Sequence, residues 1–475
     1  MISLNKNKNN QRIYFILAAG FILRTVYLLF FAEKVLGAGT YINGDTPGWT
    51  ESFKNLLTYG EYTFDRSNPE ASFGRVPGFS FFWGIHYLIF GEAYVYKAVA
   101  FTHLVLDTLC IYLLYLITIR ISKNELAGLL AALIYCCYPF VFFWLSISYS
   151  EIFSNTLNLL FFALLLKENK TTGQLILLGL LSAACFLTRE FIGLNILAGL
   201  LYLFFLEDKK SWKEAFMRCA IFVTAFMSLY IWWPVRNYFL HDRLVLTRTM
   251  GGFVLYGEDY QAFRNWIGCW DNDETIWLEK VQTDSSRVDF PAEAYTNPVD
   301  VFKVDSLIRL ARTCGSSFYL RKGSPPGVLY NGKALSLTNN CNEPIRIGFE
   351  ALTKEFMQKR PWDFWTVAPL RNLKKALLKT ELKKGSMATG ASKMTKYLFG
   401  YRSFLLFAAL AGIFISMRNK GIYPILLFVA LIVFFFCFIF RFMEMKNLLQ
   451  TDILLISFSA FFFARILKRF VNFNA

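Results

Sequence analysis

The sequence predicts an all-α polytopic membrane protein of about ten to eleven transmembrane helices, with an outward-facing soluble region of mixed α and β structure. Hydrophobic residues make up 55% of the 475 residues, and 51 of them are Phe. Several apolar runs are long enough to cross about 30 Å of hydrocarbon. One long polar region, residues 235–397, contains scattered turn-forming Gly, Pro, Asn and Asp and predicts the soluble part.

Ten apolar runs are expected to be membrane spans. The first, residues 13–31, is longer than the core of a signal peptide, which is about 7–15 residues, so we expect an uncleaved span. The other nine are residues 93–119, 126–144, 150–166, 174–187, 191–206, 215–234, 398–417, 422–440 and 448–467. Residues 76–90 are apolar but short, and this segment could be re-entrant, interfacial or the lead-in to the next helix.

The positive charge of the chain predicts its orientation. The formal net charge is +16, and Lys and Arg favour cytoplasmic loops. With ten spans, a single threading places both termini and every short basic loop in the cytoplasm, so we expect a multi-pass protein with cytoplasmic N- and C-termini. In a membrane protein this excess of charge indicates anionic lipid as a partner rather than nucleic acid.

This threading brings a set of charged residues to the outer membrane face. They are Asp45, Arg75, Glu151, Arg189, Glu190, Arg236 and Arg441. Charged groups at the ends of spans often line a polar pathway or a binding site. Interfacial snorkelling of arginine and simple solvation of the acids would also explain any one of them. Because seven gather at one face, we expect a shared outward-facing cavity.

The expected organisation has three parts. Residues 1–234 form an N-terminal transmembrane domain, whose first outer loop, residues 32–75, contains Asp45 and Arg75. Residues 235–397 form the outer region, and residues 398–475 carry the C-terminal transmembrane helices. Near the end of the outer region, Trp362 and its aromatic neighbours stand beside several lysines, which predicts an amphipathic helix on the membrane surface. A solvated basic helix is the alternative.

Cysteine and histidine usage limits the chemistry. If the outer region faces an oxidising compartment, Cys314 and Cys341 are the pair expected to form a disulfide, with Cys269 left free. The chain has only three His, which excludes a histidine-rich metal site. It also has no Walker A loop and no dinucleotide-binding glycine motif. We therefore expect no cofactor, and nothing in the sequence supports a divalent cation.

An acid facing arginines above an apolar groove is suited to transferring a group from a lipid-linked phosphate. The carboxylate of Asp45 could accept a proton from an incoming hydroxyl or amine. The guanidinium groups of Arg75 and Arg441 offer donors that match phosphate oxygens and could stabilise a leaving phosphate. The structural alternative is that Asp45, beside Gly44 and Pro47, is an ordinary turn residue.

Several stretches resemble the GT-C superfamily of membrane glycosyltransferases. They are "NGDTPGWTESFKNLLTYGEYTF", "FGRVPGFSFFWGIHYLIFG", "LAGLLAALIYCCYPFVFFWLSISYSEIF", "LGLLSAACFLTREF" and "WWPVRNYFLHDRLVLTRTMGGFVLYGED". The resemblance covers roughly residues 10–260 and 400–465. It is to the branch that includes bacterial protein O-mannosyltransferase-like enzymes and the aminoarabinose transferases acting on lipid A.

This resemblance implies a role for each candidate residue. Asp45 matches the catalytic base, and Glu151 matches a second outer-facing acid that positions the acceptor or a cation. The donor phosphate would be bound by Arg75, with Arg189, Arg236 and Arg441 as further candidates. The stretch "RFMEMKNLLQTDILLISF", which begins at Arg441, lacks the prolines of the family pattern, which puts the role of Arg441 in doubt.

The implied function is inverting transfer of a sugar from a polyprenyl-phosphate carrier to a glycan, lipid or protein on the outer, periplasmic face of a bacterial inner membrane. Two alternatives stay open. One is a polymerase or ligase that uses polyprenyl-diphosphate glycans, and the other is a transporter of lipid-linked substrates. Inverted repeats and helices broken at mid-membrane would indicate a transporter, and neither is evident in the sequence.

Overall fold

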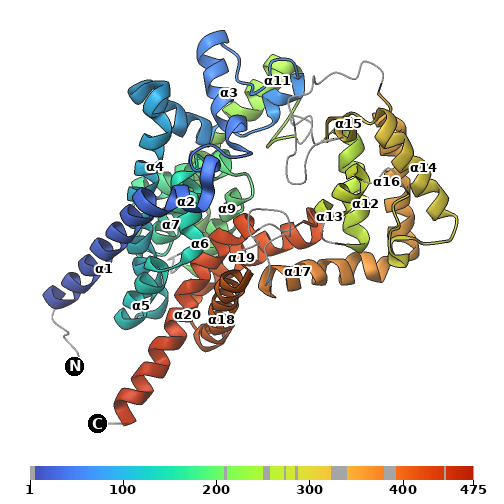
Figure 1. Cartoon of the computed structure of the whole chain (residues 1–475). Helices are drawn as coiled ribbons and strands as arrows, with labels where there is room; N and C mark the ends of the chain where they lie inside the picture. The colour runs from blue at the N-terminus through green and yellow to red at the C-terminus, as the bar shows by residue number, and fades with distance from the viewer. Residues whose placement is uncertain are drawn as a thin grey trace.

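The computed structural model describes residues 6–207, 211–249, 257–271, 274–283, 287–321, 340–378, 392–442 and 445–473, and Figure 1 shows their arrangement. The first part contains α1 (Lys6–Val26), η1 (Tyr27–Phe31), α2 (Ala32–Leu36), η2 (Gly37–Gly39), α3 (Thr46–Tyr59), η3 (Pro69–Phe73), α4 (Gly78–Ser122), α5 (Glu125–Cys136), α6 (Pro139–Ser146), α7 (Glu151–Leu165), α8 (Thr172–Thr188), η4 (Ile192–Leu194), α9 (Asn195–Leu201), η5 (Tyr202–Leu206), α10 (Trp212–Tyr230) and α11 (Trp232–His241).

The outer region and the C-terminal part are also helical. The outer region contains α12 (Glu258–Trp270), α13 (Glu274–Thr283), η7 (Ala292–Ala294), α14 (Asp300–Cys314), α15 (Ser316–Arg321), α16 (Asn342–Lys359), η8 (Asp363–Val367) and α17 (Ala368–Leu378). The last part contains α18 (Ser392–Ser416), η9 (Lys420–Ile422), α19 (Tyr423–Phe434), η10 (Phe435–Ile439) and α20 (Met445–Phe473). Both termini lie at the lower left of Figure 1, and the outer region lies at the right.

Each of the ten predicted spans coincides with a helix or a run of helices. Among the described residues, five helices are long and apolar enough to cross a membrane: Gln11–Gly39, Gly78–Ser122, Trp212–His241, Lys396–Ser416 and Lys420–Ile439. The bent pair α5 and α6 would make a sixth. Helices α7, α8 and the run Ile192–Leu206 are apolar but shorter. The protein is therefore a multi-pass membrane protein, and the number of ten spans stays a prediction.

The short apolar segment before residue 91 leads into the next helix. Residues Gly78–Ser122 form α4, which is interrupted at Gly91, where φ is +67° and ψ is 177°. Only glycine adopts this conformation without strain. Phe79 and Trp83 before the break and Val95 and Val99 after it belong to one hydrophobic cluster with Trp49 and Phe53 of the first outer loop.

Close helix packing and buried ion pairs hold the membrane part together. A Cβ at Gly412 of α18 would collide with the backbone oxygen of Phe458 in α20, so these two helices are in contact at this glycine. Arg24 of α1 forms a fully buried ion pair with Asp107 of α4, with Nε and Oδ2 2.5 Å apart. Buried charges are paired because an isolated ion in an apolar interior is costly.

The outer region is a helical domain with its own aromatic core, which includes Phe263, Trp266 and Phe349. The predicted disulfide between Cys314 and Cys341 is confirmed, as is the free state of Cys269. The mixed α and β structure predicted here is not found: the described residues between 257 and 378 form helices and connecting segments, and none of them is in a strand. Turn-rich composition signals frequent chain reversals, and short helices satisfy that signal as well as strands do.

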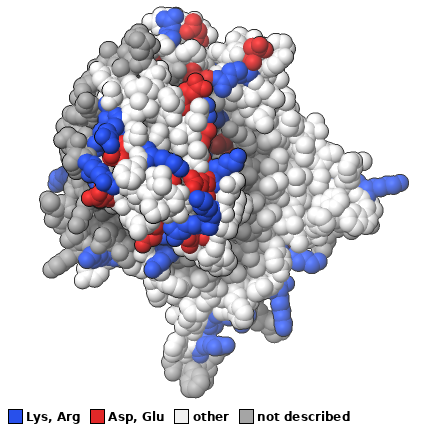
Figure 2. Space-filling model, turned by 90° about the vertical axis from the view of Figure 1, so that its right-hand side faces the viewer, with Lys and Arg blue, Asp and Glu red and all other residues white. Residues whose placement is uncertain are grey.

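The surface of the outer region differs from the neighbouring surface in the number of its charged side chains. Figure 2, seen from the right-hand side of Figure 1, shows acidic and basic groups gathered over the outer region, while much of the neighbouring surface carries none. Opposite charges pair there, as between Arg346 and Glu350, 2.9 Å apart. Helix α17 runs across the direction of α18 in Figure 1, and Trp362 and Trp365 just before it are exposed. This placement is suited to the predicted interfacial helix, which stays a prediction.

Candidate functional site

Asp45 is held in place by a tight turn and by a distant tyrosine. Asp45 directly precedes α3. The turn is closed by the backbone N–H of Thr46, which donates to the carbonyl oxygen of Asn43 at 2.7 Å. The backbone N–H of Asp45 donates to the hydroxyl of Tyr149, also at 2.7 Å. Its own side chain makes no capping bond to α3. The backbone of Asp45 is therefore fixed from both sides, and its carboxylate is not used to cap α3.

The carboxylate of Asp45 lies between two cations. Oδ1 is 3.2 Å from Nη2 of Arg75, and Oδ2 is 3.2 Å from Nζ of Lys446. The Arg75 side chain is only 10% exposed and its guanidinium stacks over the ring of Trp49, 4.6 Å from the centroid. Asp45 keeps 42% of its side chain exposed. An incoming molecule can therefore reach the carboxylate, whereas the arginine is held rigidly behind it.

These cations set the protonation state of Asp45. Desolvation would by itself raise the pKa of the carboxyl, but the charges of Lys446 and Arg75, with Arg248 further away, outweigh it and hold the pKa well below its usual value. Asp45 is thus ionised at neutral pH. A carboxylate held this strongly is a weak base, so it can accept a proton efficiently only when its cations are engaged by another anion.

A second ion pair joins the ends of α7 and α8. Glu151, in the first turn of α7, is 2% exposed, and its Oε1 lies 2.5 Å from Nη1 of Arg189, which directly follows α8. Nη2 of Arg189 also donates to Oδ1 of Asn447 at 3.4 Å. Because Asn447 directly follows Lys446, the start of α20 connects this pair to the Asp45 cluster.

A third pair adds to the same charged surface. Nε of Arg248 lies 2.5 Å from Oε1 of Glu190. Burial would raise the pKa of Glu190, but Arg248, a backbone hydrogen bond, Arg189 and Arg75 together lower it below its usual value. Positive charge from three arginines therefore reaches this carboxylate. The charged groups of the first outer loop, the end of α8 and the start of α20 form one network.

The other two predicted arginines contact different partners. Arg236 of α11 donates to the carbonyl oxygens of Ser72 and Tyr62, at 3.1 and 2.9 Å, and so ties α11 to the first outer loop. Arg441 stacks on Phe364, with 3.5 Å from its guanidinium carbon to the ring centroid, and donates to the carbonyl oxygen of the same residue at 3.1 Å. Its φ is +60°. The geometry brings Asp45, Arg75, Glu151 and Arg189 together and directs Arg236 and Arg441 elsewhere.

Sequence reasoning missed three members of the network: Lys446, Asn447 and Arg248. Lys446 and Asn447 stand at the start of the last predicted span, and a cation at an outer span end was the signal used for Arg441 five residues earlier. Arg248 lies in the quoted stretch that follows Arg236. The sequence therefore marked the positions of Lys446 and Arg248. Only their contacts with Asp45 and Glu190 distinguish them from other basic residues near the membrane.

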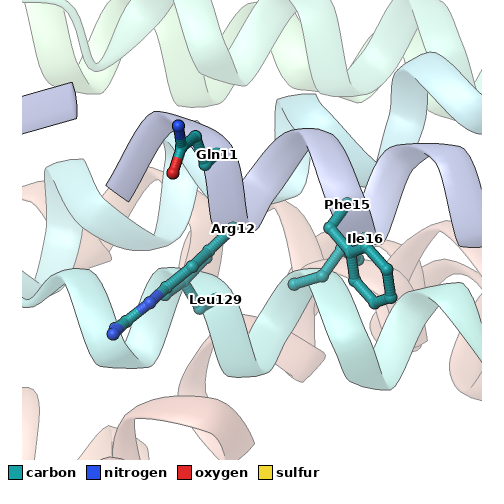
Figure 3. Close-up of a pocket in the computed structure, with 5 residues that line it drawn as sticks. All are labelled: Gln11, Arg12, Phe15, Ile16 and Leu129. Atoms are coloured by element: carbon teal, nitrogen blue, oxygen red, sulfur yellow. The ribbon is translucent and has the colours of Figure 1, made fainter. Parts of the chain in front are cut away.

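Two other features bear on the site: whether any side chains could hold a metal ion, and where an open hollow beside α1 lies. Within the ranges that the structure describes, there is no group of three or more His, Cys, Asp or Glu side chains that could hold a metal ion. The hollow between α1 and α5 is largely apolar, and its lining comprises Gln11, Arg12, Phe15, Ile16 and Leu129 (Figure 3). It lies near the N-terminus, away from Asp45, and contains none of the candidate residues.

One protein family and several solved structures are similar to this chain. Residues 74–235 match the family described as dolichyl-phosphate-mannose-protein mannosyltransferase. The fold is similar to that of the archaeal oligosaccharyltransferase AglB from Archaeoglobus fulgidus, which was solved in complex with an inhibitory peptide and a dolichol-phosphate. The sequence identity is 12% and the TM-score is 0.52, and the match covers 99% of this chain and 52% of that one. A second structure of the A. fulgidus oligosaccharyltransferase, tethered with an acceptor peptide, matches at 12% identity and 0.51, over 98% and 50%.

ArnT from Cupriavidus metallidurans, in the apo state, matches at 14% identity with a TM-score of 0.35, over 93% of this chain and 76% of that one. No curated protein matched. The chain spans about half the length of the oligosaccharyltransferases that it resembles. The family match over residues 74–235 and the shared fold agree with the predicted resemblance to the GT-C superfamily. The matched residues, 74–235, contain Arg75, Glu151 and Arg189.

Proposed function

We propose that the protein is an inverting glycosyltransferase that moves a sugar from a polyprenyl-phosphate carrier to an acceptor on the outer face of a bacterial inner membrane. The observation that carries the proposal is the partly exposed carboxylate of Asp45, held between Arg75 and Lys446. The acceptor, a glycan, lipid or protein, would approach from outside. The disulfide in the outer region supports an oxidising, extracytoplasmic location for this face, with both termini in the cytoplasm.

The proposed first step is an exchange of ion partners. The donor phosphate is an anion and would draw Arg75 and Lys446 from the carboxylate, because guanidinium and ammonium groups form strong charge-assisted bonds to phosphate oxygens. Asp45 would then be less stabilised as an anion and become a better base. Donor binding would thus activate the base, so that the two substrates act in order.

The proposed second step is a single displacement. The acceptor oxygen or nitrogen attacks the anomeric carbon while its proton passes to the Asp45 carboxylate. The bond from that carbon to the phosphate oxygen breaks, and polyprenyl phosphate leaves with the electron pair. Arg75 and Lys446 would stabilise the charge that grows on the leaving oxygen. Attack from the side opposite the phosphate inverts the configuration of the carbon. Glu151 and Arg189, fixed to each other, would shape the neighbouring part of the site.

The test is transfer of radiolabelled sugar in membranes from a panel of polyprenyl-phosphate and polyprenyl-diphosphate donors. Asp45→Asn removes the base but keeps the side-chain size, and we expect transfer to fall by about 10²- to 10⁴-fold while donor binding is retained. Asp65→Asn is the matched control, because Asp65 lies in the same loop and its carboxylate accepts hydrogen bonds from the backbone N–H and the hydroxyl of Ser67. Equal transfer by wild type and Asp45→Asn would overturn the assignment of the base. Transfer only from diphosphate donors would indicate a polymerase or ligase.

A further inference from the structure

A second charged cavity lies at the far ends of the helices that carry the candidate site. Helix α7 begins at Glu151 and ends at Leu165, and α8 runs back from Thr172 to Thr188, next to Arg189. Each helix is 15 to 17 residues long, or about 22–26 Å at 1.5 Å per residue. The loop between them therefore lies on the opposite side of the membrane part from Asp45.

This cavity has a volume of about 360 Å³. Its lining comprises Arg120, Lys123, Leu166, Glu168, Asn169, Tyr202, Leu206, Glu207, Arg218, Asn419, Lys420 and Gly421. These residues come from the ends of α4, α7 and η5, from α10, and from the turn before α19. Four of them are cations and two are acids, so the lining is positive before any further neighbour is counted.

Both acids in the lining are already neutralised. Glu207 lies 2.5 Å from Nζ of the buried Lys170 and 2.9 Å from Nη2 of Arg218. Glu168 lies 2.7 Å from Nζ of Lys123. These pairs use both carboxylates of the lining. A ligand entering the cavity would therefore meet more positive than negative charge.

Two cations are left without an acid. Nη1 of Arg120 donates to the carbonyl oxygen of Ala163, and no described carboxylate lies within 4 Å of the guanidinium. Lys420 is exposed and likewise forms no ion pair with any residue that the structure describes. Arg120 caps the end of α7, but that bond uses one of the five N–H donors of a guanidinium. The remaining donors and the Lys420 ammonium are suited to an anion.

Aromatic residues beside the cavity indicate its depth in the membrane. Trp212 and Phe205 are 65% and 62% exposed, and Trp212 packs against Phe204, 5.1 Å between ring centroids. Exposed aromatic rings gather at the level of the lipid headgroups. Basic pockets between membrane helices at this level bind anionic headgroups.

We propose that this cavity binds a phosphate group presented at the membrane face opposite the candidate active site, with Arg120 and Lys420 as its direct ligands and Lys123 at its rim. The phosphate group of an anionic phospholipid has the chemistry that such a cavity recognises, and free phosphate shares that chemistry. The proposal concerns a site separate from Asp45 and does not depend on the proposed transfer reaction.

The experiment compares two double variants of the full-length protein, purified in one detergent. Lys123→Asn/Lys420→Gln removes two charges from the lining, and Asn is chosen because Lys123 has a φ of +50°, which Asn tolerates. Lys167→Gln/Arg418→Gln is the control, because it removes the same charge from exposed residues of the neighbouring loops that do not line the cavity. Binding is measured by native mass spectrometry and by the shift in thermal stability.

The probes are short-chain phosphatidylglycerol, short-chain phosphatidylcholine and inorganic phosphate. We expect wild type and the control to bind phosphatidylglycerol saturably, and the cavity variant to bind it about tenfold more weakly, the effect of about 1.4 kcal/mol of lost contact. Binding of phosphatidylcholine that is weaker than that of phosphatidylglycerol would show that the cavity recognises an anionic headgroup. Saturable binding of inorganic phosphate alone, lost in the cavity variant, would assign free phosphate to the same cavity. Equal binding of every probe by the two double variants would overturn the proposal.

Discussion

The ammonium nitrogen of Lys446 lies 3.2 Å from Oδ2 of Asp45, across 401 residues of sequence. This contact joins the first outer loop to the start of the last helix, α20. With Arg75 on the other carboxylate oxygen, it places two cations on one acid. In the proposed function these cations serve two partners in turn, the carboxylate before the donor binds and the phosphate afterwards.

Replacing Lys446 tests that exchange. We expect Lys446→Gln to raise the KM for a polyprenyl-phosphate sugar by about 10- to 100-fold, because a hydrogen bond to a charged group contributes about 1.5–3 kcal/mol. The effect on kcat depends on how much of this contact strengthens as the phosphate leaves. The measurement is steady-state transfer of labelled sugar in detergent, with donor concentration varied.

Lys54→Gln is the matched control for this prediction. Lys54 lies in α3, its side chain has 22% exposure against 24% for Lys446, and it pairs with Glu92 at 2.8 Å. Loss of a lysine near the outer face should not by itself change donor affinity. If Lys54→Gln and Lys446→Gln raise the KM equally, the effect comes from general surface charge, and Lys446 is not a phosphate ligand.

The lowered pKa of Asp45 predicts the pH dependence of transfer. An ordinary Asp titrates near pH 3.9, and the native carboxyl titrates below that because of Lys446, Arg75 and Arg248, despite the opposing effect of desolvation. The stabilisation is therefore present above about pH 4 and is lost only as the pH falls through the lower native value. Between pH 5 and 8 the carboxylate keeps one charge state.

We therefore expect kcat/KM for the donor, which reports the free enzyme, to show no loss between pH 8 and pH 5 that depends on Asp45. Once the donor draws the two cations away, desolvation is no longer offset and the pKa of Asp45 in the donor complex rises. The measurement is the rate at sub-saturating donor across that interval, on protein shown to stay folded. A fall in rate with a midpoint near pH 6 or 7 would contradict the assignment, because an unperturbed or lowered Asp cannot titrate there.

The helical membrane part was predictable from local properties. Long apolar runs specify helices because backbone groups in lipid must be satisfied within the segment, and each run coincides with a helix or run of helices. The disulfide was predictable from the compartment expected for Cys314 and Cys341. The strands of the outer region were wrongly expected, since stretches such as residues 258–270 form helices whose buried aromatic side chains complete a core in tertiary packing.

The candidate site was predictable only in part. Asp45 and Arg75 stand in one loop with apolar flanks, so the sequence alone singles them out. The contact of Asp45 with Lys446 depends on how the first outer loop and α20 pack, and no local pattern encodes a neighbour 401 residues away. Conversely, the apolar surroundings of Arg441 predicted a functional cation, whereas its side chain packs on Phe364 of the outer region.

Arg441 offers a test between these two explanations. Arg441→Asn removes the guanidinium, while Asn tolerates the φ of +60° found at this residue. We expect a lower melting temperature of the full-length protein, because the contacts to the ring and carbonyl of Phe364 are lost. We also expect the donor KM to stay within about twofold of wild type, below the 1.4 kcal/mol that a tenfold change requires. A rise in KM like that of Lys446→Gln would instead make Arg441 a phosphate ligand, as its sequence position indicates.

The buried pair of Arg402 and Asp452 predicts a stability effect in the C-terminal part. The guanidinium of Arg402 in α18 contacts both carboxylate oxygens of Asp452 in α20, at 2.6 and 2.9 Å, and both side chains are at most 5% exposed. The hydroxyl of Tyr138 donates to the same carboxylate at 3.0 Å. Asp452→Leu would leave a buried arginine without its counter-ion, and we expect a loss of about 3–5 kcal/mol in the free energy of unfolding.

The double variant Arg402→Met/Asp452→Leu separates loss of the pair from loss of volume. Replacing both charges with apolar groups of similar size is often neutral, so we expect it to recover most of the stability that Asp452→Leu loses. Glu61→Gln, which removes one partner of the exposed pair with Arg66, should leave the melting temperature unchanged. The measurement is thermal unfolding followed by tryptophan fluorescence in one detergent. A double variant as unstable as Asp452→Leu would show that α18 and α20 need the ion pair itself, because apolar packing would then be unable to replace it.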